Sequence, residues 1–188
     1  MHGWCEPEKA VSLARAVMRA PTKVSVELGV FGGRSLIAMA MAHQHLNQGG
    51  MAWGFDPWTK EAALEGDIGN DNADWWAKVN LDEVYNTFVR HVVHHNVINH
   101  CYWFRIRAEK VVGFFEDESI GVLHIDANHS EVTSCRDSKL WSPKVAKGGF
   151  LFFDDIDWPS TAKAQKIILN SGFKEIDNRT KYAIYQKV

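Results

Sequence analysis

Three aspartates and one histidine lie directly after two short apolar segments of the chain. Asp126 and His129 follow residues 120–125, and Asp154 and Asp155 follow residues 150–153. Because the carboxyl ends of parallel strands converge on a ligand crevice, we expect these four side chains to share one small space. Three carboxylates at such short range repel one another unless a cation lies between them. The pattern therefore predicts a metal site with a base beside it.

The first apolar segment, Val24–Leu28, leads into a glycine-containing turn at residues 29–33. Glycines allow the backbone to pass close to a ligand, and the helix that follows offers free amide groups. A dinucleotide fingerprint would place glycines at positions 29, 31 and 34, but Phe31 and Arg34 occupy the last two. The turn therefore favours a small cofactor other than a nicotinamide dinucleotide. A tight turn without a ligand is the alternative.

An acidic residue also ends the second apolar segment. Asp56 follows Met51–Phe55 and precedes Pro57. A carboxylate at this point of an α/β sheet is placed to accept two hydrogen bonds from a ribose diol. An Asp-Pro pair also occurs as plain turn chemistry, so the ribose role depends on the glycine turn before it.

Apolar segments alternate with helical patterns along the chain, which indicates a doubly wound α/β domain. The predicted buried strands are Val24–Leu28, Met51–Phe55, Cys101–Ile106, Ile120–Ile125 and Gly149–Phe153. The predicted helices are Glu6–Arg19, Ser35–His45, Leu81–Val97, Glu109–Phe115, Glu131–Leu140 and Thr161–Leu169. Two further segments, Phe173–Ile176 and Tyr182–Gln186, flank a polar turn and predict a closing antiparallel hairpin. We expect a single domain over residues 1–188, with an N-terminal helix within residues 6–20 and a mostly parallel seven-stranded sheet.

The stretch from residue 58 to about residue 80 is polar, lacks a strand pattern and is long for a connection, so we expect a lid or substrate loop. Within it, Trp75 and Trp76 could stack on a sugar or aromatic acceptor, or could anchor the segment to the body. Three histidines, His91, His94 and His95, have helical spacing. They could bind zinc, but a solvated helix face is favoured.

The acidic motifs also have plainer interpretations. Asp126 could cap a helix with His129 as its neighbour in the first turn, and Asp154 and Asp155 could be polar residues without a metal. His124 lies within an apolar segment, so we expect a hydrogen-bonded core residue there rather than a ligand.

Composition excludes several classes of protein. The 21 basic and 23 acidic residues give a net charge of −2, so no basic excess favours nucleic acid or an anionic membrane. No apolar stretch approaches the ~20 residues of a membrane helix, and no signal-peptide core stands at the start. The three cysteines are unpaired by spacing, which indicates a reducing, cytoplasmic location. Tryptophans in predicted loops and edges make a homodimer possible.

Taken together, the motifs resemble those of class I S-adenosylmethionine-dependent methyltransferases. The similarity is strongest to the metal-dependent O-methyltransferase branch that includes macrolide sugar methyltransferases, with catechol-type enzymes more distant. The motifs that carry it are Glu27-x-Gly29-x-x-Gly32-Gly33, Asp56, Ile125-Asp126-x-x-His129 and Gly148-Gly149-x-x-x-x-Asp154-Asp155. The Asp-x-x-His motif and the paired Asp-Asp motif are the most specific of these.

The resemblance implies a role for each matching residue. Glu27, Gly29, Gly32 and Gly33 would border the methionine part of the cofactor, Asp56 its ribose and Ala108 its adenine. Phe31, Ser35 and Asp126 complete the implied cofactor-binding set. The implied ligands of a divalent cation, for which Mg²⁺ is the candidate, are Asp126, Asp154 and Asp155. His129 occupies the position of the general base.

We therefore expect a Rossmann-like methyltransferase that moves a methyl group from S-adenosylmethionine to a hydroxyl of a small molecule. A sugar or polyol hydroxyl is the first candidate acceptor, and a catechol-like diol is the second. The divalent ion would lower the pKa of the bound hydroxyl, and His129 would take the proton. The two rival interpretations are a nucleotide-binding oxidoreductase and a catalytically silent domain that binds the same cofactor.

Overall fold

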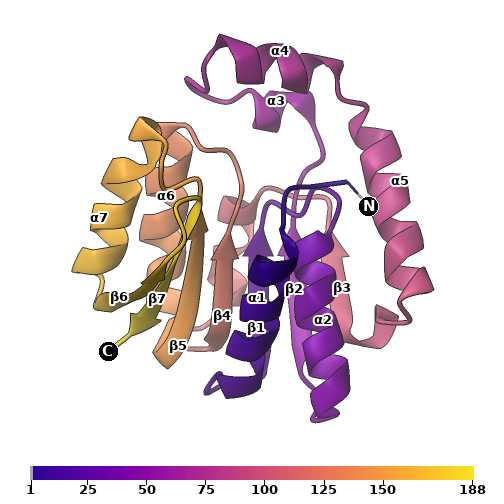
Figure 1. Ribbon diagram of the computed structural model, residues 1–188, viewed down its shortest axis with the longest axis vertical. Helices are drawn as coiled ribbons and strands as arrows, with labels where there is room; N and C mark the ends of the chain where they lie inside the picture. Colours follow the sequence, from indigo (N-terminus) through magenta and orange to yellow (C-terminus); the bar gives the residue numbers. More distant parts are fainter. Residues whose placement is uncertain (1) are drawn as a thin grey trace.

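A computed structural model, which describes residues 2–188, contains one seven-stranded sheet in the order β3-β2-β1-β4-β5-β7-β6 (Figure 1). The strands are β1 Val24–Leu28, β2 Met51–Phe55, β3 Cys101–Phe104, β4 Ile120–Ile125, β5 Val145–Asp154, β6 Phe173–Asn178 and β7 Tyr182–Lys187. The first five are parallel, and β7 lies antiparallel between β5 and β6. The predicted mostly parallel sheet with a C-terminal hairpin is confirmed.

Helices cover both faces of the sheet (Figure 1). The long helices are α1 Pro7–Arg19, α2 Arg34–Leu46, α5 Leu81–His94, α6 Glu131–Trp141 and α7 Ala162–Asn170. Apolar side chains of α1, α2 and α5 form one core layer, and those of α6 and α7 form the other. Across residues 2–188, no helix combines the length and apolar character needed to cross a membrane.

Strand β4 illustrates why the central strands are continuous apolar runs. All six of its residues are buried. Val122 faces the α1, α2 and α5 layer, whereas Leu123 faces the α6 and α7 layer. A strand that is buried on both faces carries apolar side chains on both faces rather than at alternate positions, and in β4 only His124 departs from this pattern. The sequence of β4 therefore fixes it at the centre of the sheet, where its carboxyl end opens onto the site.

Several predicted boundaries differ from the observed ones. Strand β3 ends at Phe104 rather than at residue 106, and β5 begins at Val145, before its Gly148-Gly149 pair. The helix predicted over residues 109–115 is instead two short 3₁₀ turns, Ala108–Lys110 and Val112–Phe114. Short apolar runs leave such ends poorly specified, because either a strand or a turn can bury them.

The segment predicted as a loop at residues 58–80 contains two helices, α3 Lys60–Ala63 and α4 Asn70–Lys78. Thr59 caps α3, because its side chain accepts a hydrogen bond from the backbone amide of Ala62 at 3.4 Å. Neither helix contains a fully buried residue, so neither carries the apolar stripe that predicts a helix from sequence. Both helices lie over the carboxyl ends of the parallel strands (Figure 1).

Candidate active site

The carboxyl ends of the parallel strands open into a cavity of about 900 Å³ beneath α3 and α4. Most of the residues predicted for the site line it: Gly29, Phe31, Gly32, Gly33, Ser35, Asp56, Ala108, Asp126, His129, Asp154 and Asp155. Glu27 is the exception, because its side chain is fully buried below the turn. The volume is within the usual range of small-molecule sites, ~300–1,000 Å³.

The glycine turn after β1 is packed too tightly for larger residues. A Cβ atom on Gly29 would lie 2.2 Å from the carbonyl oxygen of Asp126, and the φ angle of Gly29 is +85°. Both features demand glycine, since L side chains rarely adopt this backbone conformation. Phe31 is also left-handed, with φ +47°. The turn thereby brings the backbone of β1 against the residues that follow β4.

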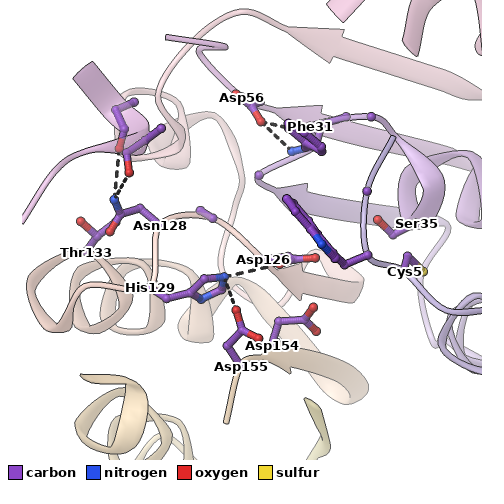
Figure 2. Close-up of a pocket in the computed structure, with 18 of the residues that line it drawn as sticks. Cys5, Phe31, Ser35, Asp56, Asp126, Asn128, His129, Thr133, Asp154 and Asp155 are labelled. Carbon is purple, nitrogen blue, oxygen red and sulfur yellow. Dashed lines mark hydrogen bonds and ion pairs between the residues drawn. The ribbon is translucent and has the colours of Figure 1, made fainter. Parts of the chain in front are cut away.

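Asp56, at the end of β2, holds the glycine turn in place. Its Oδ2 accepts hydrogen bonds from the backbone amides of Val30 at 3.0 Å and Phe31 at 2.9 Å (Figure 2), and its Oδ1 accepts from Trp58 at 2.6 Å. Burial raises the pKa of this carboxyl, while the amide hydrogen bonds oppose that rise. An ionised carboxylate has about four acceptor positions, so three amides leave one for a ligand hydroxyl.

Beneath the cavity, Glu27 and His124 form a buried polar pair. His124 Nδ1 lies 2.7 Å from Glu27 Oε1, which also accepts a hydrogen bond from the Ser35 hydroxyl. Burial raises the pKa of Glu27. Burial and Lys9 would lower the pKa of His124, but its contacts with Asp154 and Glu27 raise it to about 9. His124 is thus the hydrogen-bonded core residue that its sequence context predicts.

His129 is held between two carboxylates (Figure 2). Its Nε2 lies 3.1 Å from Asp155 Oδ2 and 3.6 Å from Asp126 Oδ1. Burial alone would lower the pKa of His129, but the neighbouring carboxylates of Asp126 and Asp155 raise it. Its ring also packs edge-on against Trp158, with centroids 5.5 Å apart. The imidazole is therefore fixed at the edge of the cavity rather than free in solvent.

Lys9 is a site residue that the sequence motifs did not identify. Its Nζ forms an ion pair with Asp154 and lies 3.4 Å from Asp126 Oδ2. The signal was present in the helix pattern, because Lys9 falls on the same buried face of α1 as Leu13 and Val17. A lysine among the apolar positions of an amphipathic helix must have a buried partner.

The three carboxylates predicted as metal ligands are not arranged as one set. Asp126 and Asp154 converge, and their oxygens, together with a nitrogen of His124, lie within 4.8 Å of one another. Asp155 points instead toward His129 (Figure 2). The histidines at 91, 94 and 95 are outside the ligand group found among residues 2–188.

An aromatic cluster lines the mouth of the cavity. It consists of Trp4, Phe31, Trp75 and Trp76. Trp4 stacks on Phe31 with ring centroids 5.2 Å apart, and Trp75 meets Trp4 edge-on at 5.0 Å. Trp4 and Trp75 nevertheless remain 63% and 42% exposed. The N-terminal segment, the glycine turn and α4 therefore meet in an apolar surface that is still open to solvent.

Polar contacts hold the α3 segment onto the body. Asn128 Nδ2 donates hydrogen bonds to the carbonyl oxygens of Ala62 at 3.2 Å and Ala63 at 2.9 Å (Figure 2). Glu65 accepts hydrogen bonds from Arg107 and, at 2.9 Å, from Arg136. These contacts explain how a segment without buried side chains keeps its position over the cavity.

Asp137, on α6, is a second residue that the sequence did not identify. Its side chain lines the cavity, but the residue is only 2% exposed and its Oδ1 has no hydrogen-bond partner. Arg136 Nε is 3.7 Å away, which is too far for a hydrogen bond. Burial raises the pKa of Asp137 to about 7, despite the charge of Arg136. A buried carboxyl oxygen without a hydrogen-bond partner is costly, and such groups gather at functional sites.

The sequence matches a known protein family. A family model described as a methyltransferase domain matches residues 26–156. No curated protein matches the sequence significantly. The matched range includes the glycine turn, Asp56, Asp126, His129 and Asp154.

Solved structures of O-methyltransferases share the fold at low sequence identity. The O-methyltransferase NovP is 16% identical with a TM-score of 0.74, covering 96% of this chain and 80% of that chain. TomG from Streptomyces achromogenes, involved in tomaymycin synthesis and solved with S-adenosylmethionine, is 12% identical with a TM-score of 0.65, covering 97% and 81%. CalS11, a calicheamicin methyltransferase, is 18% identical with a TM-score of 0.61, covering 96% and 80%. The resemblance to class I S-adenosylmethionine-dependent O-methyltransferases is confirmed, and the chain belongs to the methyltransferase-domain family.

Proposed function

We propose that the protein transfers a methyl group from S-adenosylmethionine to a hydroxyl oxygen of a small molecule. The observation that carries this proposal is the placement of His129, backed by Asp155, in the same cavity as the glycine turn and Asp56. A cofactor held by the turn and an acceptor beside His129 would then meet in one space.

The cofactor side of the cavity suits S-adenosylmethionine better than a dinucleotide. Asp56 keeps one acceptor position for a ribose hydroxyl. Gly32 and Gly33 line the cavity directly before α2. Phe31 and Arg34 replace two of the three glycines of a dinucleotide fingerprint. The TomG structure contains S-adenosylmethionine in the same fold.

The reaction requires an acceptor oxygen to lose its proton as it attacks the methyl carbon. Asp155 only accepts hydrogen bonds when ionised, so the Nε2 of His129 that faces it carries the proton. In the neutral form of His129 the lone pair is then on Nδ1, which takes the proton of the acceptor hydroxyl. A new carbon–oxygen bond forms, the carbon–sulfur bond breaks, and neutral S-adenosylhomocysteine leaves. General-base catalysis of this type contributes a factor of ~10²–10⁴ to the rate.

The divalent cation implied by the resemblance fits the chemistry of the carboxylates but not their present arrangement. Asp126 and Asp154 are hard oxygen ligands of the kind that Mg²⁺ prefers. The ammonium group of Lys9, however, lies against both of them. Because a second cation in the same space would be repelled, we assign no step of the reaction to a metal ion.

The acceptor that we propose is a hydroxyl-bearing molecule with an apolar or ring-shaped face, either a sugar or polyol or a catechol-like diol. The aromatic cluster supports this class, because Trp4 and Trp75 present open ring surfaces at the mouth of the cavity. Aromatic rings bind both sugar faces and planar rings through large contact areas.

Transfer of an isotope-labelled methyl group tests this proposal. Purified protein is mixed with methyl-labelled S-adenosylmethionine and fractionated small molecules, and the products are analysed by mass for a new methyl ether. We expect label in at least one hydroxyl compound. Binding of S-adenosylmethionine without transfer to any fraction would indicate the silent cofactor-binding domain instead.

A pair of histidine variants tests the base. His129→Ala should reduce turnover by ~10²-fold or more while its affinity for S-adenosylmethionine stays unchanged. His94→Ala, an exposed residue on α5, is the matched control and should retain full activity. Equal turnover in His129→Ala and the control would remove His129 as the base.

A further inference from the structure

A buried lysine occupies the place where the fold brings two carboxylates together. The side chain of Lys9 is 4% exposed, and that of Asp154 is 13% exposed. Lys9 comes from α1, outside the sheet, and reaches the carboxyl ends of β4 and β5 across a sequence separation of more than a hundred residues. Its Nζ also lies 5.8 Å from the ring centroid of Tyr182, which completes the enclosure.

The charge of Lys9 is maintained by these neighbours. Burial alone would lower its pKa, but the carboxylates of Asp126 and Asp154 outweigh burial and raise it. The same ammonium group lowers the pKa of Asp126, against the opposite effect of burial. The three groups therefore form an ion cluster in which each carboxylate is neutralised in part by one fixed cation.

The position of the ammonium group coincides with the position that a metal ion would need. The potential ligand atoms, one each from His124, Asp126 and Asp154, lie within 4.8 Å of one another. Lys9 Nζ contacts both carboxylates of this group. A divalent ion bound to the same oxygens would lie within a few ångströms of the ammonium, where like charges in a buried space repel strongly.

The remaining carboxylate does not restore a metal site. Asp155 is 3.1 Å from His129 Nε2, and its Oδ2 is committed to that contact. Glu27 reaches His124 from the opposite side and fixes the ring through Nδ1 at 2.7 Å. Asp155 and Glu27 are thus each engaged through one carboxylate oxygen by a histidine of the chain itself.

We propose that Lys9 is a built-in cation: its ammonium group holds Asp126 and Asp154 together, excludes divalent ions from them, and makes methyl transfer independent of added metal. The catalytic part of this inference rests on the proposed methyltransferase function. The exclusion of metal does not, because it concerns only the three charged groups. In this role Lys9 is a positioning residue that takes over the structural task of a divalent ion.

Metal binding to the intact protein tests the proposal without any reference to activity. Mn²⁺ is titrated into the full chain and followed by electron paramagnetic resonance, which distinguishes free from bound ion. The wild-type protein should bind no Mn²⁺ at the carboxylates. Lys9→Ala should create a site that binds one Mn²⁺ at least ~10-fold more tightly than any wild-type site. Adding Asp154→Asn to Lys9→Ala should abolish it.

Controls separate the possible outcomes. Lys139→Ala, an exposed lysine on α6, should bind Mn²⁺ no better than the wild type. If Lys9→Ala does not fold, the wild type and Asp154→Asn still decide the question. Stoichiometric Mn²⁺ binding by the wild type that Asp154→Asn removes would overturn the proposal.

Turnover provides the second readout. Wild-type methyl transfer should be the same in excess chelator as in excess Mg²⁺, and loss of activity in chelator would contradict the built-in cation. S-Adenosylmethionine binding is measured separately on the same samples. Failure to bind it would refute the proposed function, while the Mn²⁺ titration would still decide the role of Lys9.

Discussion

Replacement of Asp137 by asparagine gives a pH-dependent change in stability that can be worked out in advance. In the folded protein the pKa of this carboxyl is raised to about 7, from 3.8 for an ordinary aspartate, because it is buried without a partner for Oδ1. Below pH 3.8 the carboxyl is protonated in both the folded and the unfolded protein, so its ionisation does not affect stability. As the pH rises toward 7, the unfolded chain ionises while the folded chain does not, so the stability falls. The loss of stability is complete above pH 7, where the carboxyl is ionised in both states.

The magnitude follows from the difference between the two pKa values. From pH 5 to pH 8, ionisation of Asp137 should lower the free energy of unfolding by about 2–3 kcal/mol in the wild type, at 1.36 kcal/mol per pKa unit. Asp137→Asn cannot ionise and lacks this loss. The free energy of unfolding of the variant minus that of the wild type should therefore be about 2–3 kcal/mol larger at pH 8 than at pH 5. Any effect of the substitution that does not depend on pH cancels in this comparison.

Urea unfolding at pH 5 and pH 8 measures the effect, with the cofactor absent. Comparing the two proteins at each pH cancels the titration of all other groups. The control is Asp74→Asn, which removes an exposed carboxyl on α4. Its free energy of unfolding should differ from that of the wild type by less than about 0.5 kcal/mol at both pH values. If Asp137→Asn changed the free energy of unfolding by the same amount at pH 5 and pH 8, the raised pKa of Asp137 would be refuted.

Three further predictions concern the turn, the α3 segment and the acceptor. Gly29→Ala should destabilise the protein by at least ~2 kcal/mol, seen as a lower melting temperature, because its Cβ would lie 2.2 Å from the Asp126 carbonyl at a φ of +85°. Gly113→Ala, which meets open space, should be nearly neutral, and equal effects would contradict the packing argument. Asn128→Ala should speed proteolysis within residues 64–69, since the hydrogen bonds that hold α3 are lost; an unchanged cleavage rate would show that other contacts hold it. Phenolic acceptors, with a pKa of ~10, should react faster than aliphatic alcohols if Lys9 replaces a metal, and a strong preference for alcohols in a substrate panel would argue against that.

The sheet could be predicted from the sequence because its strands are strongly marked. β1, β2 and β4 are short apolar segments closed by glycine or aspartate, and their observed bounds match the predicted ones. The carboxyl ends of β2, β4 and β5 place Asp56, Asp126 and Asp154 at one edge of the sheet, which is where the cavity lies. These aspartates lie together because parallel topology places the carboxyl ends of the strands at the same edge of the sheet.

The helices α3 and α4 could not be predicted in the same way. They bury no residue completely, and their stability depends on contacts that are distant in sequence, such as those of Asn128 with Ala62 and of Glu65 with Arg136. Local periodicity contains no information about such contacts. The polar sequence of residues 58–80 therefore predicts a lid-like loop over the site but not the two helices within it.

Lys9 shows a different limit of sequence reasoning. A cluster of carboxylates predicts a neighbouring cation, and that expectation is met in the structure by an ammonium group. The sequence does not show which cation is present, because α1 and the carboxyl ends of β4 and β5 are far apart along the chain. A lysine on the buried face of an amphipathic helix was the available signal.

Calorimetric titration of the wild-type protein with S-adenosylmethionine, and separately with NAD, tests the central claim most directly. The claim is that the cavity between the glycine turn and His129 is a methyl-donor site. We expect one S-adenosylmethionine to bind per chain and no measurable heat with NAD. Stoichiometric binding of NAD, or no binding of S-adenosylmethionine, would contradict the account.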